Sequence, residues 1–534
     1  MQEPLKTAAA AQKITPPKDA RLRMSLTEAA AALEQGEVSS KELAELHLAR
    51  IDELQPKLNA FSRVFHERAV QDAEESDARR QKGELRGKYD GVPISLKENI
   101  EMAGIEATIG LKSRVGVLAD QDAPIVTLVK KSGAIILGKT NLSQLMIFNE
   151  SRNPVHGQTQ NPYDTSRTPG GSSGGEAAAI ASFQSCGGIG SDIGGSIRIP
   201  AAYCGITGLL PTTNRFPNRG MVAGIAGQEG IRGQCGPMAR KVADLRAFFD
   251  IIPARHAAIL DPAVVPMAAP NLDALEMKGL RIGIFSQDDV LEVSSSSKRA
   301  LRKVATRLQD MGCEVSEFQP PCTREMIFTY IGLLSADGAK SMGELVDYDG
   351  LDPALQTLWK LARMPKRLRK VAAKGARLVD RNVAELLDVL GEKSVQEMWA
   401  LVARTRTLSR QVFDAWNAQK LDVIVAPVHA SPAIPHGMSR EYTLGGAFAF
   451  HFNFLHCPSG SLPVTTVQPG EDVRFKVKGK LEKIAAECEL GSVGMPVGLQ
   501  FAARPYREDI VLKVMQELET NMADDDDMPH LASW

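Results

Sequence analysis

The length and composition of the chain are typical of a globular protein with little net charge. Its 534 residues exceed what one small core needs, so they form either one large elaborated domain or two to three ordinary ones. Hydrophobic residues make up 43% of the chain, charged residues make up 24%, and the net charge is -1. Such a chain has no overall field that would attract nucleic acid, so we expect no nucleic-acid partner.

Cysteine and hydropathy patterns indicate the compartment. The seven cysteines are odd in number and show no CxxC pair or metal-ligand spacing, which predicts reduced thiols and no metal site. No stretch of about 18 apolar residues occurs, and the first 25 residues lack the apolar core of a signal peptide. We therefore expect a cytoplasmic protein.

Helical and strand patterns alternate along the chain. Ser25 with Glu28, and Ser39 with Glu42, match capping boxes, which predicts helix between 25 and 54. Short β-branched runs that end in Gly, Pro or polar residues predict strands, and amphipathic stretches between them predict helices. The strands are expected at 92–96, 134–137, 280–285, 422–428, 462–467 and 493–501, and the helices at 123–131, 297–311 and 510–518. This alternation indicates an α/β fold with a largely parallel or mixed sheet.

No internal repeat or linker divides the chain, so we expect a single domain over 25–520. It would be preceded by an N-terminal tail (1–24) and followed by an acidic C-terminal tail (521–534), in which the run Asp524 to Asp527 is expected to be disordered. A basic segment at 353–382 carries nine Lys or Arg against one acidic residue between Lys360 and Arg381. Two interpretations stay open for it: a solvated outer helix pair, or an amphipathic cap that touches an anionic membrane or guides an apolar substrate inward.

The most unusual stretch, 170–200, holds two turns rich in serine and glycine, centred on Ser172 and Ser196. A segment of small residues at 176–183 separates them and is expected to form a closely packed helix. Glycines in the second turn allow successive backbone N–H groups to surround the Ser196 hydroxyl. Acyl transfer needs such donors for its oxyanion, and each is typically worth about 3 to 4 kcal/mol.

A serine nucleophile also requires a base. The nine histidines show no local motif that ties one of them to these turns, whereas Lys97 ends the apolar run GVPISLK. A lysine that is neutral near pH 7 must have its pKa lowered by roughly three, about 4 kcal/mol of differential stabilisation. Lys139, in GKTN, is a rival base, and we interpret it as a surface charge.

Four motifs together resemble the amidase-signature family. They are GVPISLKEN (91–99), GKTN (138–141), GGSSGG (170–175) and DIGGSIRIP (192–200), and GQCGPMAR (233–240) and VGMPVGLQ (493–500) are most similar to its fatty acid amide hydrolase branch. The resemblance implies an α/β/α layered fold with a mixed central sheet covered by helices, and a helical insertion at about 340–400 that shapes the substrate entrance. It also implies a homodimer and no cofactor.

The resemblance assigns catalytic roles to three side chains. Lys97 would be the base, Ser172 would relay the proton, and Ser196 would attack the carbonyl. Because a hydroxyl donates one proton while accepting another, Lys97 need not touch the nucleophile. The substrate would be a small-molecule amide with an apolar or fatty-acyl chain, and esters or carbamates present a similar carbonyl.

Further residues follow from the same resemblance. The oxyanion hole would consist of backbone N–H groups, those of Ile193, Gly194, Gly195 and Ser196. Supporting or substrate-binding positions would be Met146, Ser173, Asp192 and Arg198.

Three other functions stay open. GGSSG also satisfies GxSxG, which would make Ser172 the nucleophile of an α/β-hydrolase, but this interpretation leaves the second serine turn unexplained. The amidase subunit of a glutamine-dependent tRNA amidotransferase shares the serine and lysine pattern. A non-enzymatic scaffold is the third.

Overall fold

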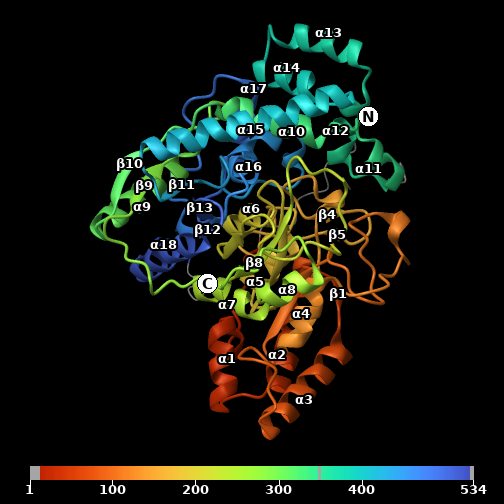
Figure 1. Cartoon of the computed structure of the whole chain (residues 1–534), viewed down its shortest axis with the longest axis vertical. Helices are drawn as coiled ribbons and strands as arrows, with labels where there is room; N and C mark the ends of the chain where they lie inside the picture. The colour runs from red at the N-terminus through yellow and green to blue at the C-terminus, as the bar shows by residue number, and fades with distance from the viewer. Residues whose placement is uncertain (1–11, 226, 347–349, 530–534) are drawn as a thin grey trace.

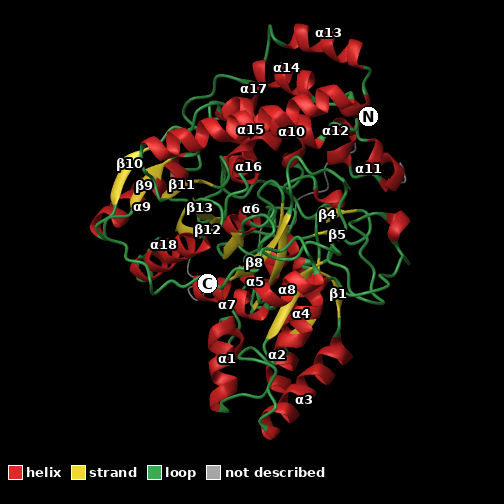
Figure 2. Cartoon of the chain, viewed as in Figure 1, coloured by secondary structure: helices red, strands yellow, loops and turns green. Residues whose placement is uncertain are grey.

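The computed structural model describes residues 12–225, 227–346 and 350–529, and its centre is an 11-stranded sheet. The strand order is β1-β3-β2-β6-β8-β7-β12-β13-β11-β9-β10. Figure 2 shows these strands crossing the middle of the molecule, with helices around them. The strands are β1 (Phe61–Val64), β2 (Pro93–Lys97), β3 (Ile135–Thr140), β6 (Gly187–Asp192), β7 (Thr207–Leu210), β8 (Gln234–Ala239), β9 (Arg281–Ile284), β10 (Glu314–Glu317), β11 (Val423–Pro427), β12 (Ser459–Thr466) and β13 (Pro496–Ala502).

Both strand directions occur in this sheet. Strand β2 pairs in parallel with β3 and β6, whereas β6 pairs antiparallel with β8. Strands β9, β10 and β11 are mutually parallel, and β12 and β13 are antiparallel. The predicted α/β fold with a mixed central sheet is confirmed, and the six strands expected from the sequence all form within a few residues of their predicted bounds. A separate hairpin joins β4 (Arg152–Asn153) to β5 (Gly157–Gln158).

Helices flank the sheet along most of its length (Figure 1). They are α1 (Leu26–Gln35), α2 (Ser40–Leu58), α3 (His66–Lys82), α4 (Pro124–Ser132), α5 (Gly174–Ala181), α6 (Arg198–Tyr203), α7 (Val242–Ile251), α8 (Ala254–Leu260), α9 (Ser295–Asp310), α10 (Thr323–Leu334), α16 (Ala447–Phe454), α17 (Lys480–Glu489) and α18 (Glu508–Asn521). Ser25 and Ser39 form complete capping boxes, so α1 and α2 begin where the sequence predicts. They are separate helices because Gly36 ends α1 in the left-handed region at φ 71°.

Five further helices of the described residues lie between α10 and β11 in the chain. They are α11 (Lys340–Leu345), α12 (Pro353–Arg363), α13 (Lys366–Ala376), α14 (Arg381–Val389) and α15 (Val395–Ala418). In Figure 1, α13 lies at the tip of the molecule opposite α1 and α3. Among the helices of the described residues, none is both long and apolar enough to cross a membrane.

The two predicted tails are held against the domain where the structure describes them. Ile14 and Leu22 are buried, and residues 1–11 lie outside the described residues. The expectation of a disordered acidic run is wrong, because Asp525 and Asp527 form ion pairs with a basic row on α9. That row is Arg299, Lys303 and Arg307, whose spacing of four residues places all three on one face of the helix.

Candidate active site

The stretch 170–200 folds into turn, helix α5, strand β6, turn and helix α6, and almost all of it is buried. Ala177, Ala178, Ala179 and Ala181 allow α5 to pack closely against the sheet. Gly175 is required at its first turn, since a Cβ atom there would lie 2.4 Å from the Asn141 carbonyl oxygen. The small residues thus place the Ser172 turn and the Ser196 turn side by side, and the Ser173 N–H donates to the Ser196 carbonyl at 3.2 Å.

Lys97 is the last residue of β2 and is fully buried. Its Nζ lies 2.7 Å from Ser172 Oγ and 3.0 Å from Ser191 Oγ. Burial lowers the pKa of Lys97 to about 7, although the negative charge of Asp192 partly opposes this shift. A substantial fraction of the amine is therefore neutral near pH 7, so it can accept a proton from the neighbouring hydroxyl.

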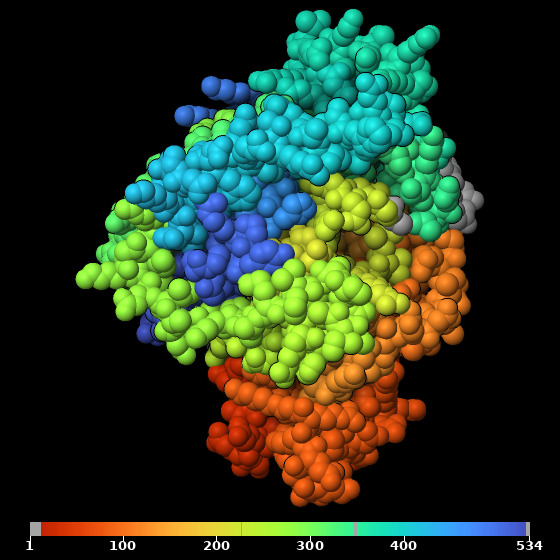
Figure 3. All heavy atoms as spheres, viewed as in Figure 1, coloured from red at the N-terminus to blue at the C-terminus, as the bar shows by residue number. Residues whose placement is uncertain are grey.

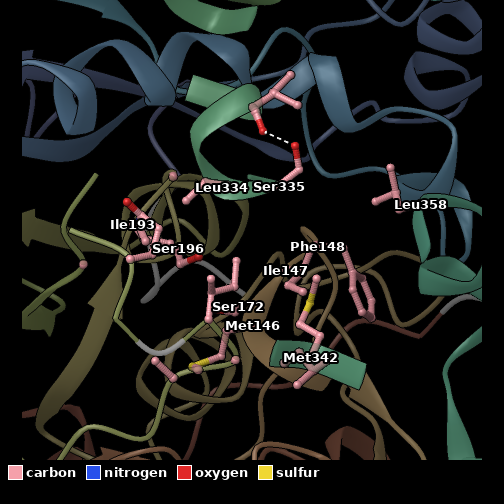
Figure 4. A pocket seen from close by; sticks show the side chains of 18 of the residues that line it. Met146, Ile147, Phe148, Ser172, Ile193, Ser196, Leu334, Ser335, Met342 and Leu358 are labelled. Carbon is pink, nitrogen blue, oxygen red and sulfur yellow. Dashed lines mark hydrogen bonds between the residues drawn. The ribbon is translucent and has the colours of Figure 1, made fainter. Parts of the chain in front are cut away.

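Ser172 and Ser196 both line one cavity, and Figure 4 shows their side chains on the same wall. Both serines are described residues, and their two hydroxyls are not joined by a hydrogen bond. Passing a proton between them requires a rotation of one hydroxyl or a small approach of the turns, as catalytic hydrogen bonds often tighten only with substrate bound. The structure thus brings Lys97 into contact with Ser172, and Ser172 into the same cavity as Ser196.

Asp192 holds the second turn in shape. Its buried carboxylate accepts hydrogen bonds from the N–H groups of Gly195, at 2.7 Å, and Ile197, at 3.1 Å. Burial disfavours ionisation, but Arg198 and the hydrogen bonds outweigh it and lower the pKa of Asp192. Because the Gly195 N–H already donates to Asp192, an oxyanion would have to share this N–H with the carboxylate. The oxyanion hole formed by the N–H groups of Ile193, Gly194, Gly195 and Ser196 stays a prediction.

Arg198 connects this turn to the C-terminal half of the sheet. Its guanidinium pairs with Asp192 and also donates to Gln500 Oε1 at 2.6 Å and to Asn453 Oδ1 at 2.5 Å. A fully buried arginine is tolerated only where such partners satisfy its donors. Arg198 therefore supports the turn through Asp192, and it is not among the residues that line the cavity.

Met146 and Ser173, the other supporting candidates, differ in their placement. Met146 lines the cavity and, with Leu145, has a left-handed backbone, at φ 59° and 56°. Two successive residues with a Cβ in this region are strained, which is frequent at functional sites. The Ser173 hydroxyl donates to the Ser191 carbonyl at 3.3 Å and so fixes the end of β6.

Lys139 is not the surface charge that we expected. It is 1% exposed, its Nζ donates to the Glu106 carbonyl at 2.9 Å, and burial lowers its pKa to about 8. Acidic groups such as Glu98 partly offset this burial. The Lys139 amine bonds Glu106 and neither serine, so its contacts, and not its exposure, argue against Lys139 as the base.

Sequence reasoning missed two buried polar residues beside Lys97. Ser191 contacts the Lys97 amine, and its position directly before Asp192 could have indicated this. Glu176, on α5, accepts hydrogen bonds from the hydroxyls of Ser95 and Thr140 on the two strands that carry the lysines. Burial raises the pKa of Glu176 to about 7, which keeps much of the carboxyl neutral near the base.

The α/β-hydrolase alternative requires a histidine whose ring forms a hydrogen bond with the Ser172 hydroxyl. His429, just after β11, and His451, on α16, are both buried, and burial lowers their pKa values to about 4 and about 3. His429 bonds Ser431, and no histidine of the described residues forms a hydrogen bond with Ser172 or Ser196. The arrangement does not support a Ser-His site.

The cavity has a volume of about 540 Å³ and is mostly apolar. Its far wall comes from α10, α11, α12 and α14, and Figure 4 shows Leu334, Met342 and Leu358 facing the serines across it. Figure 3 shows a hollow in the surface beside the yellow segment of the chain, in the half of the molecule where these helices lie. None of the described residues that line the cavity is a lysine or an arginine.

A buried lysine of lowered pKa beside a serine, with a second serine on a turn of close N–H groups, is the kind of arrangement that acyl transfer by a serine requires. A family model described as Amidase matches residues 42–512, so the chain belongs to this family and is an amide-hydrolysing enzyme. The chain is 34% identical to fatty-acid amide hydrolase 1 of Sus scrofa, over 81% of this chain and 76% of that one. It is 31% identical to a glutamyl-tRNA(Gln) amidotransferase subunit of Myxococcus xanthus, over 93% and 96%.

Solved structures show the same family. A fatty acid amide hydrolase superposes with a TM-score of 0.84 at 27% identity, covering 96% of this chain and 87% of that chain. The peptide amidase of Stenotrophomonas maltophilia gives 0.72 at 26% identity, covering 95% and 98%.

Proposed function

We propose that the enzyme hydrolyses neutral amides with an apolar, fatty-acyl chain. The observation that carries this proposal is the cavity beside Ser196: it is large, apolar, and lined by no lysine or arginine among the described residues. Apolar walls favour an alkyl chain, because burying each methylene is worth about 0.8 kcal/mol. The likeness to a fatty acid amide hydrolase supports the same substrate class.

The proposed mechanism uses a Ser-Ser-Lys triad. Neutral Lys97 accepts a proton from Ser172, which takes one from Ser196 as the Ser196 oxygen attacks the amide carbonyl. Backbone N–H groups of the second turn stabilise the negative oxygen of the tetrahedral intermediate. The proton returns through Ser172 to the leaving nitrogen, amine departs, and water hydrolyses the acyl-enzyme along the same path.

A second candidate is an amidase subunit that takes glutamine, since the M. xanthus relative matches 93% of this chain. Glutamine carries an α-carboxylate, for which a basic side chain is the ordinary partner. Because no described residue of the cavity lining supplies one, the apolar amide is favoured.

The test is amine release from amides that differ only in acyl length, from acetyl to dodecanoyl, with glutamine as an added substrate. We expect kcat/KM to rise up to about fourfold per methylene until the cavity is filled. Leu358→Asn, in the cavity, should weaken this dependence, whereas Leu490→Asn, at an exposed leucine elsewhere, should keep it. A flat or falling series, or turnover of glutamine alone, would contradict the proposal.

We also propose that the basic segment contacts an anionic lipid surface. Within it, α12 turns Leu355, Leu358 and Trp359 toward the cavity, whereas α13 leaves Leu368 61% and Val371 68% exposed beside several lysines and arginines. An exposed apolar and basic helix at the tip of the molecule is suited to a lipid surface.

Co-sedimentation with vesicles tests this contact. The wild type should bind vesicles containing phosphatidylglycerol more strongly than vesicles of phosphatidylcholine, and added salt should weaken the binding. The double variant Leu368→Ser, Val371→Ser should bind several-fold less, whereas Ile259→Ser, at an exposed residue of α8, should not change it. Equal binding by all three proteins would exclude this surface.

A further inference from the structure

Tyr330 connects the cavity to the turn that carries the nucleophile. It lies on α10, is 4% exposed, and lines the cavity. Its hydroxyl donates a hydrogen bond of 2.9 Å to the carbonyl oxygen of Ile193. The proposed catalytic steps do not use this residue, and no sequence motif pointed to it.

The hydrogen bond acts on the peptide unit that contains a proposed oxyanion donor. Because the peptide between Ile193 and Gly194 is planar and trans, its C=O and N–H point in opposite directions, so a partner that fixes one also fixes the other. A donor bound to the carbonyl also polarises the peptide and strengthens its N–H as a donor. Tyr330 is thus placed to orient the Gly194 N–H.

The Tyr330 ring is held on two sides. It stacks on Phe450 of α16, with ring centroids 4.5 Å apart and an angle of 11° between the planes. A Cβ atom on Gly194 would lie 2.3 Å from the Tyr330 hydroxyl oxygen, so the turn approaches as closely as only glycine permits. Since Tyr330 and Phe450 both line the cavity, an acyl chain bound there would contact the two rings and restrict their motion.

We propose that Tyr330 is a positioning residue that couples filling of the acyl cavity to the geometry of the oxyanion turn. The inference rests on the proposed function, because it takes an acyl chain as the occupant of the cavity. A long chain packs against Tyr330 and Phe450, limits the motion that remains to the Tyr330 ring and so preorganises the Gly194 N–H, whereas a short chain does not reach the two rings. Chain length then affects kcat as well as binding, because the donor matters most in the transition state.

The test compares Tyr330→Phe with the wild type on a short and a long acyl amide, with kcat and KM measured separately. Wild-type kcat should be higher for the long amide. Tyr330→Phe should lower kcat on the long amide by about tenfold or more, and change kcat on the short amide and both KM values by less than about threefold. Tyr442→Phe is the matched control, because it removes another buried hydroxyl, bonded to Ser431 at 2.7 Å, away from the oxyanion turn.

Other outcomes separate the inference from the proposed function. An equal loss of kcat on both amides, a change in KM alone, or no change would overturn the coupling and leave the proposed function intact. A wild type that prefers short amides would overturn both, and this is determined without any variant. If Tyr330→Phe does not fold, Phe450→Leu removes the stacked ring and should flatten the dependence of kcat on chain length in the same way.

Discussion

Replacing Ser196 with alanine should lower kcat by about 10³ to 10⁶, because the variant has no atom that can form the acyl-enzyme. The remaining rate would come from the oxyanion donors and from substrate binding alone. The measurement is amine release, together with the mass of the intact protein after exposure to an aryl carbamate. Wild type should gain one acyl adduct, and Ser196→Ala should gain none.

A matched serine controls for damage to the fold. Ser185 is buried just before β6, and its hydroxyl donates to the Gly187 carbonyl at 2.7 Å, far along the strand from Ser196. Ser185→Ala should keep both turnover and the adduct. If Ser196→Ala gained the adduct and Ser172→Ala did not, Ser172 would be the nucleophile and the α/β-hydrolase alternative would be restored.

Replacing Lys97 with alanine should cost about 10² to 10⁴ in kcat at pH 7, the usual contribution of a general base. In the wild type the base must be neutral, and its pKa is about 7, so activity should rise with pH through about 7 and level off above it. In Lys97→Ala this step should be absent, and the low residual activity should increase steadily with hydroxide concentration. The measurement is kcat/KM from pH 5.5 to 10.

Lys139 supplies the comparison for this profile. It is also a buried lysine, but it contacts the Glu106 carbonyl and neither serine. Lys139→Met should therefore keep the step near pH 7, whatever it does to stability. A step that vanished in Lys139→Met and persisted in Lys97→Ala would exchange the roles of the two lysines.

Short sequence patterns predicted the features that depend on neighbouring residues alone. Capping boxes located α1 and α2, β-branched runs located six strands, and the two serine turns marked the site because their glycines and hydroxyls adjoin in sequence. The burial of Lys139 could not be predicted, because it depends on the loop around Glu106 that covers it. Tyr330 lies more than a hundred residues from Ile193, and only the tertiary fold shows their contact.

Asp192 illustrates a different limit. Its position in the motif indicated support for the turn, but not which N–H groups it accepts. The hydrogen bond that engages Gly195 depends on the backbone angles of the turn, which the sequence GGS leaves open. The acidic run at 524–527 likewise looked unstructured only because its basic partners on α9 are distant in sequence.

The partners of Arg198 determine when the site can form during synthesis. Asn453 and Gln500 leave the ribosome about 250 and 300 residues after Arg198, so a nascent chain lacks the groups that hold this arginine until residue 500 has been made. Until then Asp192 and Arg198 of the second turn are present, but Asn453 and Gln500, which hold Arg198, are not. Chains truncated before β13 should therefore carry Lys97 and both serines and still be inactive, so that hydrolysis begins only after β13 has joined the sheet.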